Sequence, residues 1–242
     1  MDFQLNYPDS KAVFGIAISI IAYYTYYYLI TSEKIEKYFI KKYTGNSFQK
    51  KRILFNKLAG LTFLALIPGT LFIIMWEFEL NSLGFSFDKI ISNWYWLIGL
   101  PAIIFIINYF SAKKPDIYLQ YPQMRIKSWS IGTFLLSTLG WSLYLISYEF
   151  LFRGVLLLSC IEAFGIWPAI AINIAIYSAI HMTNGVKETI GAIPFGLIAC
   201  LLMVHTGSLL IPIIMHISLS VSTEFFTIRN NPDMEFKKSS KP

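Results

Sequence analysis

The chain has 242 residues, of which 55% are hydrophobic and only 14% are charged. A soluble domain carries roughly a quarter charged residues, so this composition excludes a soluble fold; it equally excludes collagen, a disordered chain and a secreted disulfide scaffold. The net charge is +6. The Lys and Arg side chains lie mainly between long apolar runs, where they orient a protein in the bilayer rather than bind nucleic acid.

Apolar segments of helical length follow one another along the chain. Continuous runs of near twenty residues predict membrane-spanning helices, because the strands of a β-barrel alternate polar and apolar residues over about ten positions. The predicted fold class is therefore an all-α, polytopic transmembrane helix bundle of about seven spans in a single membrane domain. The expected spans cover residues 12–30, 55–76, 94–111, 129–163, 167–181, 190–205 and 208–226.

The stretch over residues 129–163 is too long for one upright span, because it would reach about 52 Å at a rise of 1.5 Å per residue. Gly140 is a candidate break, and the alternative is that part of the stretch lies at the membrane interface. Pro68-Gly69 predicts a kink in the second span, and Pro212 predicts one in the last.

The basic loops predict the orientation. Residues 32–52 and 112–127 together hold eleven Lys and Arg residues, and the positive-inside rule puts both loops and the C-terminal tail in the cytoplasm. With seven spans the N-terminus then lies outside. The many Ile, Lys, Asn and Tyr residues indicate an AT-rich bacterial genome, so the expected location is a bacterial plasma membrane, crossed several times.

Ionisable groups inside spans are informative, because each costs about 2.5–3.5 kcal/mol at a helix centre on insertion scales. Three sets stand out, all in the C-terminal half: Tyr148 to Arg153, Tyr177 to His181, and His216 to Ser220. Glu149 and Arg153 stand four positions apart with the acid first, so they share one helix face and can neutralise each other.

The depth of these residues follows from counting. Gly165 is the natural turn of a helical hairpin, with Glu149 sixteen residues before it and His181 sixteen after. Both therefore lie roughly 24 Å from the turn and can face each other. His216 lies nine residues past Gly207, near the middle of the bilayer. The geometry permits one cluster of Glu149, Arg153, His181, His216 and Ser220.

The three motifs, in this order, resemble the CPBP family, which comprises type II CAAX prenyl endoproteases and bacteriocin-processing or Abi-type membrane proteins. The family pattern is Glu-Glu-x-x-x-Arg, then Phe-x-x-x-His, then His-x-x-x-Asn, and the resemblance covers about residues 130–226. It implies an intramembrane endopeptidase that cleaves membrane-associated peptides or proteins. A carboxylate and His181 would activate water, while His216 and the polar residue of the third motif would stabilise the oxyanion.

The chain departs from the family pattern at two positions. Tyr148 replaces the first Glu, to which the family usually gives the activation of water, and a phenol cannot act as that base. Ser220 replaces the Asn, a milder change because Ser still donates a hydrogen bond. The implied catalytic residues are therefore Glu149, His181, His216 and Ser220, with Arg153 as a structural partner. A carboxylate held ionised by Arg153 is a weak base, which predicts slow or narrow activity.

Other interpretations remain open. Glu149, His181 and His216 form a His₂Glu set that could hold a zinc ion, which would make the chain a metalloendopeptidase; otherwise no cofactor is expected. The competing class is a catalytically degenerate pseudoprotease that acts as a membrane binding or immunity protein. A transporter with a proton relay is a weaker third interpretation, because the chain has no inverted repeat.

The predicted organisation has three parts: N-terminal transmembrane helices and basic loops over residues 1–128, the motif-bearing helix bundle over 129–228, and a polar cytoplasmic tail over 229–242. Cys160 and Cys200 are expected to be small core residues rather than a disulfide or metal pair. The expected partners are a membrane-associated peptide or protein substrate and the lipid bilayer, with no nucleic acid. The oligomeric state is left open.

Overall fold

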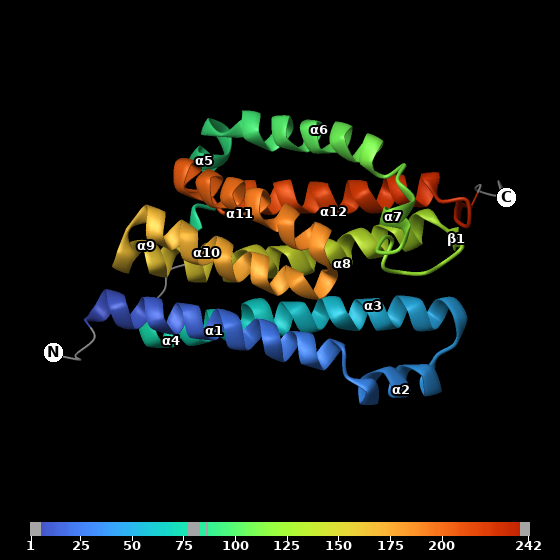
Figure 1. The fold of residues 1–242 in the computed structure, drawn as a ribbon, viewed down its shortest axis with the longest axis horizontal. Coiled ribbons are helices and arrows are strands. Elements are labelled where there is room, and N and C mark those ends of the chain that lie inside the picture. Colours follow the sequence, from blue (N-terminus) through green and yellow to red (C-terminus); the bar gives the residue numbers. More distant parts are fainter. Residues whose placement is uncertain (1–5, 77–82, 86, 238–242) are drawn as a thin grey trace. The chain divides into compact units, whose positions relative to one another are not determined.

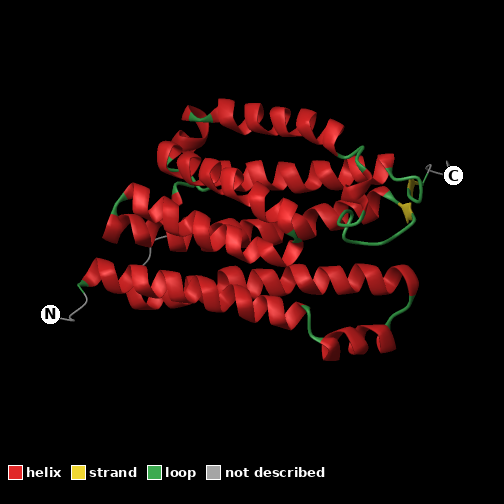
Figure 2. Cartoon of the chain, viewed as in Figure 1, coloured by secondary structure: helices red, strands yellow, loops and turns green. Residues whose placement is uncertain are grey.

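The computed structural model describes residues 6–76, 83–85 and 87–237, almost entirely as helices (Figure 2). The predicted tail therefore lies partly outside the described residues, at 238–242. Within the described ranges, seven helices are long and apolar enough to cross a membrane: Tyr7–Ile30, Gly45–Trp76, Trp94–Ser111, Ile131–Phe164, Ile166–Asn184, Val186–Thr206 and Leu210–Asn230. The all-α, polytopic fold class is confirmed, and the chain is a multi-pass membrane protein.

The elements follow one another in chain order, and Figure 1 labels the α-helices and β1 among them. They are α1 (Tyr7–Ile30), α2 (Glu33–Lys42), α3 (Gly45–Leu61), the π-helix η1 (Thr62–Leu66), α4 (Ile67–Trp76), α5 (Phe87–Ser92), α6 (Trp94–Ser111), α7 (Pro115–Tyr118), β1 (Ser128–Trp129), α8 (Ile131–Glu149), the π-helix η3 (Phe150–Leu157), α9 (Leu158–Phe164), α10 (Ile166–Ile180), the 3-10 helix η4 (His181–Asn184), α11 (Val186–Thr206), α12 (Leu210–Asn230) and β2 (Glu235–Phe236).

The first basic loop is largely helical. Within it, α2 begins with Glu33 and Glu36 and ends with Lys41 and Lys42, an order of charges that complements the helix dipole. Its apolar residue Phe39 is buried. The following helix, α3, starts at Gly45, ten residues before the predicted start of the span, because its basic first turns continue the helix beyond the apolar run.

Two of the predicted interruptions do not form. The helix runs through Gly140 without a break, since a break in hydrocarbon would leave backbone groups without hydrogen bonds. Gly140 instead allows close packing, because a Cβ there would lie 3.3 Å from Lys57 Cγ and 3.6 Å from Leu54 Cδ2. Pro212 lies in the first turn of α12, where a helix does not need its N–H, so it cannot kink the span. At Pro68 the helix also continues, directly after the π turn of η1.

The chain folds into two compact units, each assembled from separate stretches. The first unit holds Met1–Tyr28, Gly60–Trp94 and Ile146–Ile213, and the second holds Leu29–Ala59, Tyr95–Leu145 and Ile214–Pro242. Neither unit coincides with a continuous piece of the chain. The predicted boundaries at residues 128 and 228 remain a prediction.

In the first unit, hydrogen bonds fasten the connections between spans. Leu209 donates its backbone N–H to the Leu83 carbonyl at 2.9 Å, and Lys89 Nζ donates to the Gly207 carbonyl at 2.8 Å. A Cβ on Gly84 would lie 1.8 Å from that Gly207 oxygen, so only glycine permits this approach. The turn that carries Gly207 is thereby held by Leu83 and Lys89.

In the second unit, the predicted basic loop and the tail fold against each other. Ser128 and Trp129 pair in parallel with Glu235 and Phe236. Beneath this short ladder lies a cluster of buried apolar side chains, Met124, Ile126, Trp129 and Ile228. The segments next to the spans Ile131–Phe164 and Leu210–Asn230 therefore share a small apolar core.

Candidate active site

The first motif straddles a change of helix type. The α-helix α8 ends at Glu149 and the π-helix η3 begins at Phe150. In a π-helix each backbone N–H donates to the carbonyl five residues before it, instead of four. Some carbonyls therefore lose their α-helical partner, and such segments are frequent at functional sites. Here the Phe152 carbonyl accepts a hydrogen bond from Asn173 Nδ2 at 2.7 Å. Cys200 Sγ donates to Asn173 Oδ1 at 3.3 Å, so α10 and α11 both fasten η3.

Glu149 and Arg153 form a fully buried ion pair. Both side chains are 0% exposed, and Arg153 Nη1 lies 3.1 Å from Glu149 Oε2 and 3.3 Å from Oε1. The same guanidinium nitrogen, Nη1, therefore lies close to both carboxylate oxygens. Because an isolated charge in the bilayer is expensive, the two opposite charges compensate each other inside the protein.

The rest of the Arg153 guanidinium lies against an aromatic ring. Its Cζ is 4.3 Å from the centre of the Tyr177 ring, a cation–π contact that lowers the cost of burying the charge. Gly196 makes room for this arrangement, because a Cβ there would lie 3.1 Å from Tyr177 Cδ1 and 3.7 Å from Arg153 Nη2.

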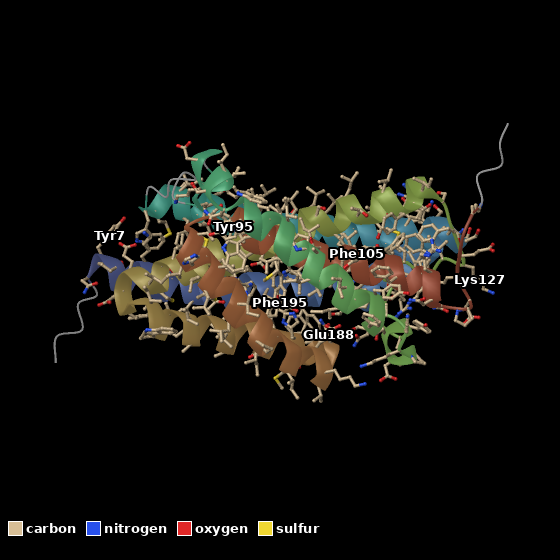
Figure 3. The ribbon with its side chains drawn as sticks, turned by 90° about the horizontal axis from the view of Figure 1, so that it is seen from above. Tyr7, Tyr95, Phe105, Lys127, Glu188 and Phe195 are labelled. Carbon is tan, nitrogen blue, oxygen red and sulfur yellow. The ribbon has the colours of Figure 1, made fainter. Side chains whose placement is uncertain are left out.

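Tyr148, at the position where the family pattern has its first Glu, lies among aromatic rings. Its ring is edge-on to Tyr177 at 5.7 Å and to His181 at 6.2 Å, and it is 4.7 Å from Phe152. Phe195 of α11, which is labelled in Figure 3, stacks on Tyr177 of the second motif, with ring centroids 6.3 Å apart. Where the family pattern has a carboxylate, this chain therefore presents the face or edge of a phenol to the histidine.

The orientation of His181 is set by its own helix. His181 Nδ1 lies 2.7 Å from the Tyr177 carbonyl oxygen. Since a carbonyl oxygen can only accept, Nδ1 carries the hydrogen, and the lone pair of a neutral ring is then on Nε2. The ring also packs on Tyr177, with centroids 4.6 Å apart. Glu149, Arg153, Tyr148 and His181 thus belong to one cluster within the first unit.

The third motif lies in the second unit, on α12. His216 and Ser220 are both buried, one helical turn apart on the same face. Next to them, Asn108 of α6 donates from Nδ2 to Ser222 Oγ at 2.7 Å and to the Leu219 carbonyl at 3.0 Å. The convergence of His216 and Ser220 with the cluster of the first unit remains a prediction.

The sequence analysis missed a second set of buried ionisable groups, in the second unit. Glu224 is fully buried, and Ser137 Oγ donates to its Oε2 at 2.7 Å. Lys57, also buried, holds its Nζ 3.1 Å from the centre of the Trp141 ring and 4.7 Å from that of Tyr144. The signal was a Lys and a Glu inside the predicted spans 55–76 and 208–226, close to one end of each.

A metal site requires several donor side chains that lie close together. Among residues 6–76, 83–85 and 87–237, no group of three or more His, Cys, Asp or Glu side chains could hold a metal ion. The zinc site predicted from Glu149, His181 and His216 remains a prediction. Cys160 and Cys200 are both buried free thiols, in agreement with their predicted role as core residues.

Comparison with known families supports the resemblance seen in the motifs. Residues 127–222 match the family described as type II CAAX prenyl endopeptidase Rce1-like. This segment holds all three motifs and makes up less than half of the chain. Neither the curated proteins nor the solved structures gave a match.

Proposed function

We propose that this protein is an intramembrane endopeptidase that hydrolyses peptide bonds of membrane-associated peptides or proteins. The observation that carries the proposal is the buried Glu149–Arg153 pair in one cluster with His181, inside the segment that matches a peptidase family. Tyr177 links the pair to the histidine, because Arg153 Cζ lies 4.3 Å from the centre of its ring and its centroid lies 4.6 Å from that of His181.

In the proposed mechanism, Glu149 and His181 activate a water molecule. The Nδ1–H of His181 donates to the Tyr177 carbonyl, so His181 accepts a proton of the water at Nε2. Glu149 stabilises the positive charge that then develops on the His181 ring. Hydroxide attacks the scissile carbonyl carbon, and the proton is returned to the leaving amine. His216 and Ser220 would donate to the oxyanion. Arg153 holds the Glu149 carboxylate in place through the buried ion pair.

The substrate class follows from the setting of the site. In a bacterial plasma membrane a prenylated CAAX protein is not the expected substrate, and a bacteriocin leader, a signalling peptide or a membrane protein is. With both basic loops in the cytoplasm, water and substrate would enter from the cytoplasmic side.

One observation favours a second candidate function, a pseudoprotease that binds a partner without cutting it. Tyr148 is buried and occupies the catalytic carboxylate position with an aromatic ring that contacts Phe152, Tyr177 and His181. A site packed in this way could bind an apolar peptide segment or confer immunity without hydrolysis.

The experiment compares cleavage of a membrane-anchored peptide library by purified protein in liposomes. The endopeptidase proposal expects cleavage by the wild type and a loss of at least about 100-fold in Glu149→Gln and His181→Gln, with no loss in the control His205→Gln. If the wild type is inert and Tyr148→Glu cleaves while Tyr148→Gln does not, the pseudoprotease is correct. If none of these proteins cleaves, the endopeptidase proposal is wrong.

A further inference from the structure

The first span carries five tyrosines between residues 23 and 28, and they differ in burial. Tyr23 is only 7% exposed, whereas its neighbour Tyr24 is 44% exposed. Residues 127–222 match the peptidase family, so α1 lies outside the matched segment. A buried hydroxyl in a membrane helix needs a partner, and the partner of Tyr23 lies far along the chain.

That partner is the last residue of α10. Tyr23 Oη donates to the Ile180 carbonyl oxygen at 3.3 Å, and Thr183 Oγ1 donates to the same oxygen at 3.1 Å. The carbonyls of the last turn of a helix have no partner within the helix itself. Two hydroxyls, one from α1 and one from η4, therefore hold this end of α10.

The anchored carbonyl is one peptide bond from the second-motif histidine. At Ile180 the α-helix ends, and at His181 the tighter 3-10 helix η4 begins. The direction of the His181 ring depends on where this change occurs, because its Nδ1 must reach back to the Tyr177 carbonyl. The Tyr23 ring also lies edge-on to Tyr148, at 6.5 Å, and the Tyr148 ring in turn lies edge-on to His181, at 6.2 Å.

We propose that Tyr23 is a positioning residue of the candidate active site, which sets the orientation of His181 by holding the Ile180 carbonyl from the first span. The expected effect of Tyr23 on catalysis rests on the proposed function. Its expected effect on the orientation of His181 does not. It extends the site beyond the segment that matches the family, since α1 would be required for His181 to work.

The first test measures catalysis. Tyr23→Phe removes one oxygen and keeps the ring contact with Tyr148. We expect kcat to fall about tenfold, the effect of one lost hydrogen bond on an oriented group, with KM nearly unchanged. The pH dependence of kcat should shift as well, because the ring that accepts the proton is no longer held. Tyr24→Phe removes the same atom from an exposed neighbour and should behave as the wild type.

The second test does not require activity. The chain has three histidines, His181, His205 and His216, so a histidine-labelled sample in micelles gives few side-chain NMR signals. The signal absent in His181→Gln identifies His181. We expect Tyr23→Phe and Thr183→Val each to move this signal and its titration, and to leave that of His205 in place.

The two tests separate the two proposals. If the wild type cleaves nothing but Tyr23→Phe still moves the His181 signal, the proposed function fails and the positioning role stands. If the wild type cleaves, and neither Tyr23→Phe nor Thr183→Val changes kcat or the His181 titration, the positioning role is wrong. Equal effects of Tyr23→Phe and Tyr24→Phe would also overturn it.

Discussion

Replacement of Arg153 by Met tests whether the buried ion pair holds the motif-bearing helix together. The substitution leaves the Glu149 carboxylate, which is 0% exposed, without its counter-charge. Removal of one partner of a buried pair costs about 3–5 kcal/mol. For a chain of this size each kcal/mol lowers the melting temperature by about 2–4 °C, so we expect a fall of roughly 6–20 °C.

The double variant Glu149→Gln/Arg153→Met separates the cost of an unpaired buried charge from the loss of the Arg153 side chain itself. It leaves no buried charge, so its main loss is the cation–π contact of Arg153 with Tyr177, 4.3 Å from the ring centre, worth about 2 kcal/mol when desolvated. The double variant should therefore be more stable than Arg153→Met alone. The free energies of unfolding of the wild type, both single variants and the double variant form a cycle that isolates the pair.

The chain provides a matched control for this cycle. Glu33 and Lys37 have the same spacing and the same nitrogen–oxygen distance of 3.1 Å, but their side chains are 86% and 77% exposed. Glu33→Gln should leave the melting temperature unchanged, because exposed pairs contribute little. Thermal unfolding in detergent, followed by circular dichroism, measures all of these proteins. The reasoning is refuted if the destabilisation of the double variant equals the sum of those of the two single variants.

Three further predictions follow from local geometry. Ser137→Ala removes the hydroxyl that donates to Glu224 Oε2 at 2.7 Å, and the loss of a bond to a buried charged group should cost about 1.5–3 kcal/mol in thermal unfolding. Gly165→Ala should cost about 1–3 kcal/mol in the same assay, because Gly165 has φ 80° and ψ 174°, a conformation nearly restricted to glycine. Thr183→Cys, the orientation probe, should be blocked on intact cells only by membrane-permeant thiol reagents.

Each of these has a control and a contrary outcome. Ser142 donates to the carbonyl of Thr138 in its own helix, so Ser142→Ala should change little, and an equal effect of the two serines would contradict the role of Glu224. Gly191 is inside α11 with open space around it, so Gly191→Ala should be neutral or slightly stabilising. Blocking of Thr183→Cys by an impermeant reagent would show that this end of the site faces outward.

The spans and the Glu149–Arg153 pair could be predicted because both depend on residues near one another in the sequence. An apolar run of sufficient length spans a membrane whatever surrounds it, and two residues four apart on a helix face the same way. The aromatic packing of Tyr177 on His181 is local in the same sense. These features need no knowledge of which helices are neighbours.

The remaining features depend on contacts between distant segments. Gly140 was a candidate helix break in the sequence, because a single sequence does not reveal its close approach to Lys57 and Leu54. The hydrogen bond from Tyr23 to Ile180 joins residues 157 positions apart, and no pattern in a single chain reveals it. The burial of Lys57 over Trp141 is equally a product of helix packing, which turns what looks like a flanking charge into an interior one.

The π-helix η3 has a consequence for the evolutionary comparison of this chain with its relatives. Because its hydrogen bonds span five residues rather than four, η3 holds more residues than an α-helix of the same length. A relative with an unbroken α-helix there would have fewer residues between its Arg and the following turn. A gapless alignment would then rotate its positions by about 100° per residue around the helix. In this helix a one-residue gap is the physically expected change, and homologous positions are those that occupy the same face.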